Sequence, residues 1–173
     1  MVPFRCQPMD SAVALRFRET GIDDGGNRLH RRIADHHSPC RHCLAEAVPG
    51  QAVVLGSYHF GRPNGIYWTP SPIWVHAKGC ARFEQVNVIP DIVRNRLVSV
   101  RAYDANDFCL YDLGDVGDGR EVDALLDRCL ADPRTDFVNI HTGRAAFCAA
   151  SSGGSVSVID AQSAKISGDT LIA

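Results

Sequence analysis

The sequence predicts an α+β fold, built on a mainly antiparallel β-sheet with one clear helix and a C-terminal extension. Two observations carry this prediction. Short runs rich in β-branched and aromatic residues recur along most of the chain, separated by turns rich in Gly, Pro, Asn and Asp. One segment with apolar residues at helical spacing then comes late, at about residues 119–131. Strands followed by a helix are typical of an α+β domain.

The strand with the strongest pattern covers residues 97–103, LVSVRAY. Its alternation places Val98 and Val100 on one face and Arg101 and Tyr103 on the other. A turn, DAND, follows, so we predict that the next apolar run pairs back on this strand as a hairpin. Further strands are predicted at residues 13–19, 29–35, within 49–58, and at 73–77, 108–113, 136–141 and 144–150.

The helix predicted over residues 119–131 has clear start and stop signals. Asp118 is the predicted N-cap, and Glu121 three residues later completes the pattern of a capping box. Asp132 and Pro133 end the helix, because the residue before a proline disfavours helical geometry. Its apolar stripe consists of Val122, Leu125, Leu126, Cys129 and Leu130.

The chain is expected to form a single domain over residues 1–150, followed by an extension. Its 173 residues, of which 45% are hydrophobic, are typical of one globular domain. Residues 151–173 change to a Ser/Gly-rich composition, which indicates a linker and a C-terminal extension. The segment SVSVID within it could add as a strand to a sheet edge, in its own chain or in a neighbour's, and so make an oligomer.

Composition also limits the partners and the location that we expect. A net charge of −2 gives no reason to expect nucleic acid or a membrane surface as a partner. No apolar run approaches the length that spans a bilayer, and the N-terminus lacks the core of a signal peptide, so we expect a cytoplasmic protein. Seven cysteines, an odd number, then favour free thiols or metal ligands over a disulfide framework.

Several short motifs occur in a recognisable order. They are PCR-x-x-L at residues 39–44, PG-x-x-x-x-L at 49–55, PI-W-V-H at 72–76 and RAYDA at 101–105. With the late helix, this order resembles the bacterial domain-of-unknown-function family numbered 1203, over about residues 30–150. The resemblance implies a domain but no activity, so the function has to be argued from the residues.

Two pairs of residues are candidate metal ligands. Cys40 and Cys43 form a C-x-x-C pair, and His76 and Cys80 form an H-x-x-x-C pair. Three thiolates and one imidazole are a tetrahedral zinc set. Two observations argue against a zinc site. The gap between the two pairs is long, and many members of the family that this sequence resembles carry serine at the position of Cys43. The alternatives are separate buried thiols, or a redox pair that lacks its usual strand-to-helix setting.

Arginine and histidine side chains suggest a second candidate site. On the strands predicted above, Arg101 and His141 lie opposite the apolar faces, and they point together if their strands share a sheet. Arg41, Arg101 and Tyr103 would then bind a small anionic molecule, while His141 and His59 would transfer protons. The alternative is a solvated sheet face that carries no ligand.

Three functions therefore stay open, and whether the protein is an enzyme stays open with them. The favoured one is the binding or transformation of a small anionic molecule in the arginine and histidine pocket. The second is a zinc-supported interaction module, with zinc as the cofactor. The third is a structural or assembly protein that acts through its C-terminal tail.

Overall fold

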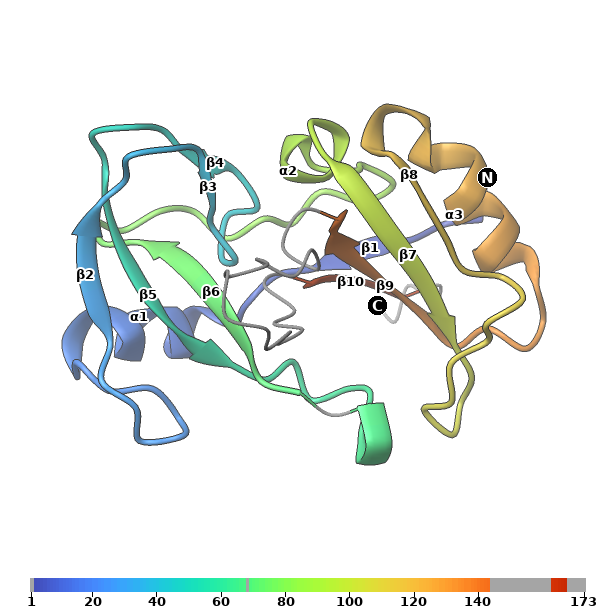
Figure 1. Ribbon diagram of the computed structural model, residues 1–173, viewed down its shortest axis with the longest axis horizontal. Helices are drawn as coiled ribbons and strands as arrows, with labels where there is room; N and C mark the ends of the chain where they lie inside the picture. The colour runs from blue at the N-terminus through green and yellow to red at the C-terminus, as the bar shows by residue number, and fades with distance from the viewer. Residues whose placement is uncertain (1, 68, 144–162, 168–173) are drawn as a thin grey trace, which may run out of the picture.

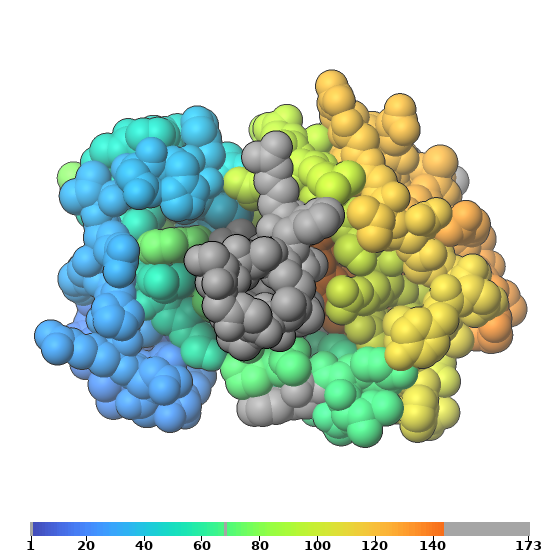
Figure 2. All heavy atoms as spheres, in the orientation of Figure 1, coloured from blue at the N-terminus to red at the C-terminus, as the bar shows by residue number. Residues whose placement is uncertain are grey.

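A computed structural model describes residues 2–67, 69–143 and 163–167. Antiparallel sheets dominate a mixed α and β structure, which confirms the predicted fold class. Two halves lie side by side in Figure 1, one built on a three-stranded sheet and the other on a five-stranded sheet. In the space-filling view most of the first half, in blue to green, lies on one side and the second half, in yellow-green to orange, on the other (Figure 2).

The smaller sheet has the strand order β2-β5-β6, and both pairings are antiparallel. Its elements are β2 (His30–Ile33), β5 (Ala52–Tyr58), β6 (Ser71–His76) and the covering helix α1 (Ser11–Glu19). These strands confirm the predictions for 29–35, 49–58 and 73–77. Phe17 and Ala14 of α1 join Val54 and Ile73 of the sheet in one buried core.

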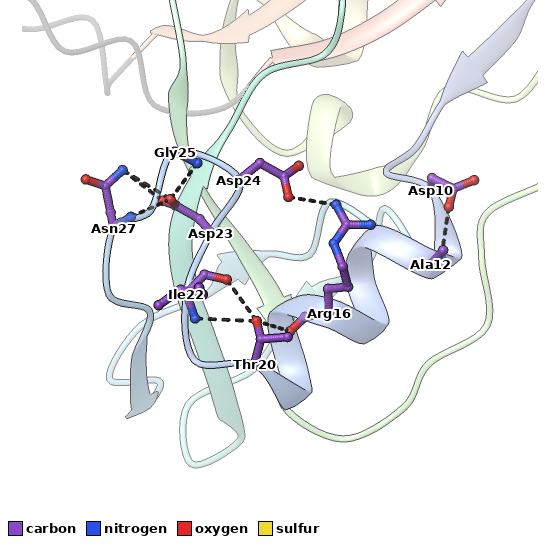
Figure 3. Close-up of polar contacts among 9 residues, drawn as sticks. All are labelled: Asp10, Ala12, Arg16, Thr20, Ile22, Asp23, Asp24, Gly25 and Asn27. Atoms are coloured by element: carbon purple, nitrogen blue, oxygen red, sulfur yellow. Dashed lines mark hydrogen bonds and ion pairs between the residues drawn. The ribbon is translucent and has the colours of Figure 1, made fainter.

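The strand predicted over residues 13–19 is wrong, because this segment lies within α1. Asp10 caps the helix, since its carboxylate accepts a hydrogen bond from the Ala12 N–H at 2.8 Å (Figure 3). The buried side chains Ala14 and Phe17 are three residues apart, as expected for one face of a helix. The alternating letters of VALRFRE imitate a strand, but burial follows the helical period.

The larger sheet has the strand order β1-β10-β9-β7-β8, with every pairing antiparallel. Its strands are β1 (Arg5–Gln7), β7 (Leu97–Tyr103), β8 (Asp115–Asp118), β9 (Phe137–Thr142) and β10 (Ser163–Ser167). The strands predicted over 97–103 and 136–141 are confirmed. Val98 and Val100 of β7 pack with Ile140 of β9 in the core of this half.

Two helices cover the apolar face of the larger sheet. They are α2 (Asp91–Arg94) and α3 (Val122–Ala131). A short 3₁₀ turn, η2 (Gly119–Glu121), leads into α3, and the Asp118 carboxylate caps it by accepting from the Arg120 N–H at 2.9 Å. The predicted helix is therefore confirmed, with its first turn in 3₁₀ geometry. In the described part of the chain, no helix combines the length and the apolar character needed to cross a membrane.

The strand predicted over residues 108–113 is reduced to one antiparallel bridge, between Cys109 and Tyr103 at the end of β7, and the longer pairing of β7 is with the later strand β8. Asp104 closes a tight turn after β7 by accepting a hydrogen bond from the Phe108 N–H at 2.9 Å. A second turn follows, in which the Leu113 N–H donates to the Leu110 carbonyl at 3.0 Å. The Leu110 N–H still donates to the Ala102 carbonyl of β7 at 2.8 Å, but both leucines pack on the core of the larger half, so the segment turns inward after this contact.

Part of the predicted C-terminal extension lies in the larger sheet. Strand β10 pairs with β1 on one side and with β9 on the other, so it is an interior strand. The segment SVSVID and the strand predicted over residues 144–150 lie outside the described residues. The division into a domain of residues 1–150 and an extension of residues 151–173 stays a prediction.

One buried carboxylate holds the loop that follows α1. Asp23 is only 5% exposed. It accepts hydrogen bonds from the N–H groups of Gly25 at 2.9 Å and Asn27 at 2.8 Å (Figure 3), and from Ser57 of β5 at 3.0 Å. Burial acts to raise the pKa of Asp23, but the hydrogen bonds from Asn27, Ser57 and Gly25 together outweigh it and lower that pKa below its usual value.

We expect Asp23→Asn to lower the free energy of unfolding by about 1.5–3 kcal/mol at pH 7, because hydrogen bonds to a charged acceptor are lost. The pKa of Asp23 is lower in the folded than in the unfolded chain. Its stabilising effect is therefore complete above the unfolded pKa of about 4, and it is lost as the pH falls through the folded pKa. Urea unfolding of both proteins should give a difference that shrinks on going from about pH 7 to about pH 3.

The control for this experiment is Asp24→Asn in the same loop. Asp24 pairs with Arg16, and its side chain is 56% exposed (Figure 3). A change at such a surface position should stay within about 0.5 kcal/mol. Equal losses in the two variants at neutral pH would contradict the role given to Asp23.

Candidate metal centre

A small hairpin carries the first two candidate ligands at its tip. Its strands are β3 (Ser38–Pro39) and β4 (Glu46–Ala47). The Cys40 N–H donates to the Ala45 carbonyl at 2.9 Å, and the Leu44 N–H donates to the Cys40 carbonyl at 2.9 Å. Leu44 adopts a left-handed φ of 51°, which closes the turn. We call residues 40–43 the knuckle.

The knuckle lies against the end of β6. Cys40 forms a parallel bridge with Trp74, and the Arg41 N–H donates to the Trp74 carbonyl at 2.8 Å. His76, the last residue of β6, donates its backbone N–H to the Cys40 sulfur at 3.4 Å. A bend then follows β6 and brings Cys80 back to the same place. Backbone contacts thus join the two halves of the candidate ligand set.

The four predicted ligands meet in one place, close enough to hold a single ion. Cys40, Cys43, His76 and Cys80 each offer one ligand atom, and these atoms lie within 4.8 Å of one another. The sulfurs of Cys40 and Cys80 are 3.9 Å apart, and the Cys43 sulfur is 3.5 Å from Nδ1 of His76. Zinc bonds of about 2.3 Å to sulfur and about 2.0–2.1 Å to nitrogen require edges of about 3.8 Å between sulfurs and about 3.6 Å between sulfur and nitrogen. Both distances agree with these edges.

The three sulfurs are coupled electrostatically. Hydrogen bonds from the thiols of Cys43 and then Cys80 hold the pKa of Cys40 far below its usual value, although burial opposes this. The same hydrogen bonds to Cys40, followed by burial, raise the pKa of Cys43 and of Cys80. A divalent cation among these sulfurs would displace the remaining thiol protons, because cysteine binds metals as the thiolate. None of the six cysteines in the described residues forms a disulfide.

Three further side chains support Cys80 and His76 from outside the ligand set. Arg18 of α1 donates two hydrogen bonds, one from Nη2 to the Cys80 sulfur at 3.3 Å and one from Nε to the His76 carbonyl at 3.0 Å. Nδ1 of His42 lies 3.2 Å from the same sulfur, and its Nε2 lies 3.0 Å from the Ser11 hydroxyl. A metal-bound Cys80 thiolate could only accept, so in the metal-loaded site Nδ1 would carry the proton and Nε2 would accept from Ser11. Burial lowers the pKa of His42, which favours this neutral form.

The sequence analysis missed Arg18, His42 and Ser11, and the error at α1 explains part of this. In a strand, Ser11 and Arg18 would point to opposite faces, because they are seven positions apart and side chains alternate at each position. In a helix seven residues make about two turns, so both side chains lie on one face. The pattern C-x-x-C does not indicate where the His42 side chain points. That orientation depends on the packing of α1 against the knuckle.

Arg41 lies between the first two ligands and is buried in the protein interior. It is 1% exposed, and its guanidinium stacks over the Phe60 ring at 4.3 Å. Its Nε and Nη2 atoms have no hydrogen-bond partner among the described residues. Burial lowers the pKa of Arg41 to about 10, which still leaves the side chain charged at neutral pH. Buried charged groups of this kind are costly unless an acceptor is supplied.

Arg101 and His141 lie on the same face of the larger sheet. Strands β7 and β9 pair Arg101 with Asn139 and Ser99 with His141, so Arg101 and His141 are diagonal neighbours. Their strands therefore do share a sheet, which the anion hypothesis required. His141 is 6% exposed, so this face is not simply solvated at that position.

Tyr103 and His59 occupy other surroundings. The Tyr103 ring stacks on Phe137 with a centroid separation of 4.9 Å, and it is 3% exposed. His59 follows β5 in the smaller half, where its Nδ1 accepts a hydrogen bond from the Gly61 N–H at 3.1 Å. Burial lowers the pKa of His59. Tyr103 thus belongs to an aromatic cluster, and His59 belongs to the other half of the molecule from His141.

These features define a small α+β domain that carries a Cys₃His group fit for a metal ion. A family model for proteins of unknown function (DUF1203) matches residues 37–151, and the chain belongs to this family. The match confirms the resemblance found in the sequence and includes all four candidate ligands. Comparison with curated proteins and with solved structures gives no match.

Proposed function

We propose that this protein is a zinc-binding domain in which Cys40, Cys43, His76 and Cys80 hold one structural zinc ion. The spacing of the four ligand atoms carries the proposal, since it fits a zinc tetrahedron. Four protein ligands complete the coordination sphere, as in structural sites, whereas catalytic zinc sites keep one position open. The ion would fasten the knuckle to the end of β6 and to the segment that follows it.

The surroundings of the cluster support this proposal. Three thiolates and one divalent ion leave one net negative charge at the site. The Arg18 guanidinium, which donates to the Cys80 sulfur, is placed to balance that charge. His42 and the backbone N–H of His76 add further hydrogen bonds to sulfur. Such bonds orient the ligands and favour the thiolate form.

We expect the purified protein to contain about one zinc ion per chain, as measured by plasma mass spectrometry. Cys40→Ser and His76→Ala should abolish this binding, because each removes a ligand. The control is Cys109→Ser, a half-buried cysteine of the larger half, which should keep its zinc. Wild-type protein that takes up neither zinc nor cobalt would contradict the proposal, as would loss of zinc from the control.

Arg18→Gln should weaken zinc binding by about 10–100-fold, the usual effect of removing a group that supports a metal ligand. Competition with a chromophoric chelator measures this affinity. The matched control is Arg16→Gln on the same helix, whose side chain pairs with Asp24 and is 49% exposed. Equal zinc affinity in the Arg18 variant and the wild type would remove Arg18 from the site.

As a second function, we propose the binding of a small anionic molecule by arginine and histidine side chains. The candidates are Arg41, Arg101 and Tyr103 as binding residues and His59 and His141 as proton-transfer groups. Arg41 and His141 have the most support, because both line the same cavity and Arg41 has two buried donor atoms without a partner. Buried guanidinium groups bind carboxylates and phosphates through paired hydrogen bonds.

For this second function we expect a thermal shift with small anions. A ligand whose concentration is about 100 times its dissociation constant stabilises the folded state by about 2.7 kcal/mol. This raises the melting temperature by several degrees. Short carboxylates and inorganic phosphate should be screened against sodium chloride at equal ionic strength. If none exceeds the effect of chloride, the protein has no such site.

The assembly function proposed from the C-terminal tail stays a prediction of the sequence. Both edges of β10 are paired within its own chain, to β1 and to β9. This strand therefore has no edge left for a second copy. The remaining tail segments named in the sequence lie outside the described residues.

A further inference from the structure

Two adjoining hollows lie where the hairpin that carries the knuckle meets the larger half. The inner hollow is lined by Arg41, His141 and apolar side chains of α2, β7 and β9. The outer hollow is lined by Trp74, Arg96 and other polar side chains. Pro39 and Thr142 line both, so the two spaces share a wall. Residues around 30–40, in blue, and around 90–97, in yellow-green, both appear on the face shown in Figure 2.

Buried hydrogen-bond donors without a partner are concentrated on the two arginines that line these hollows. In the part of the chain that the structure describes, four buried side-chain polar atoms lack a hydrogen-bond partner. Three of them belong to the two arginines that line the hollows, namely Nε and Nη2 of Arg41 and Nη1 of Arg96. Arg96 is held in place by Glu46, whose carboxylate lies 2.7 Å from Nη2. Such donors are normally satisfied, so their concentration indicates an acceptor that binds here.

The size of each hollow indicates what that acceptor is. The inner hollow has a free volume of about 10 Å³. On the same scale, a cavity that holds one water molecule has a volume of about 10–15 Å³. It therefore admits about one oxygen atom, and its walls include the apolar side chains Ile92, Val98 and Ile140. The outer hollow offers about 810 Å³ beside Trp74. A singly charged carboxylate on a small organic body fits this division better than a hydrated phosphate dianion, whose desolvation costs more.

We propose that the paired hollows bind a small organic carboxylate between Arg41 and Arg96, and that the metal-binding knuckle holds Arg41 in position for it. This inference rests on the second function proposed above and names its ligand class and its residues. One carboxylate oxygen accepts from Arg41 in the inner hollow, and the other faces Arg96. Arg41 lies between the metal ligands Cys40 and Cys43, so an ion on the knuckle fixes the backbone that carries it.

The competing explanation is that Arg41 only balances the charge of the zinc and thiolate cluster. The two explanations differ in what they require of Arg96, which is not part of the knuckle. They also differ in linkage, because a ligand that binds better to the metal-loaded knuckle must strengthen metal binding by the same factor. Both differences can be measured on the zinc-loaded full chain.

The experiment titrates propionate into the zinc-loaded protein by calorimetry at constant ionic strength, with zinc content measured for every variant. We expect Arg96→Gln and Arg41→Lys to weaken propionate binding at least about 10-fold with zinc retained, as expected for loss of a charged hydrogen bond. Arg134→Gln, a surface variant with a side chain 50% exposed, should bind as the wild type does. Propionate should also tighten zinc binding in the wild type and not in Arg41→Lys.

Three results would overturn the inference. If Arg101→Gln loses propionate binding while Arg96→Gln keeps it, the anion lies on the sheet face, and the second proposed function survives without this site. If inorganic phosphate binds at Arg96 and propionate does not, the ligand class is wrong. If no anion binds the wild type and Arg41→Lys loses zinc, Arg41 is only the counter-charge of the metal centre, and the second proposed function fails as well.

Discussion

The backbone contact between the knuckle and β6 is the constraint on which the rest of the candidate site depends. Cys40 and Arg41 meet Trp74 through main-chain groups, and this brings the Cys40 sulfur next to the backbone of His76. The ligands are thus placed near one another by the fold itself. Pre-organisation of this kind reduces the conformational entropy that a metal ion would otherwise have to offset on binding.

The same contact gives the knuckle two different sides. Toward α1, Arg18 and His42 both contact the sulfur of the ligand Cys80. Toward the larger half, Arg41 enters the space lined by His141. Because Arg41 lies between Cys40 and Cys43, a metal ion on the knuckle would constrain the backbone that carries this buried guanidinium. This is how the two proposed functions are connected physically.

The sequence predicted most of the sheet and the helix after residue 118, and it failed at two segments. The alternation in 97–103 was decisive because Val98 and Val100 of β7 are buried, whereas the alternate positions from Leu97 to Arg101 are exposed or half-buried. In residues 13–19 a strand-like composition was misleading, because composition over seven residues does not separate a strand from a short helix. In residues 108–113, two leucines that the sequence assigned to a strand pack inward from turns. Local patterns do not carry this information, because it depends on contacts with distant elements.

For the candidate site, the sequence by itself determined which side chains can bind a metal, through their residue types. The local spacing within each pair also determined that its two members can bind the same ion. Only the tertiary structure decided that the pairs meet, because Cys43 and His76 are 33 positions apart and the pairing of β5 with β6 closes that distance. The tertiary structure also decided that α1 supplies Arg18, and that the buried residues Arg41 and His141 line one cavity. These placements follow from long-range packing, which fixes where a side chain points only after the whole fold has formed.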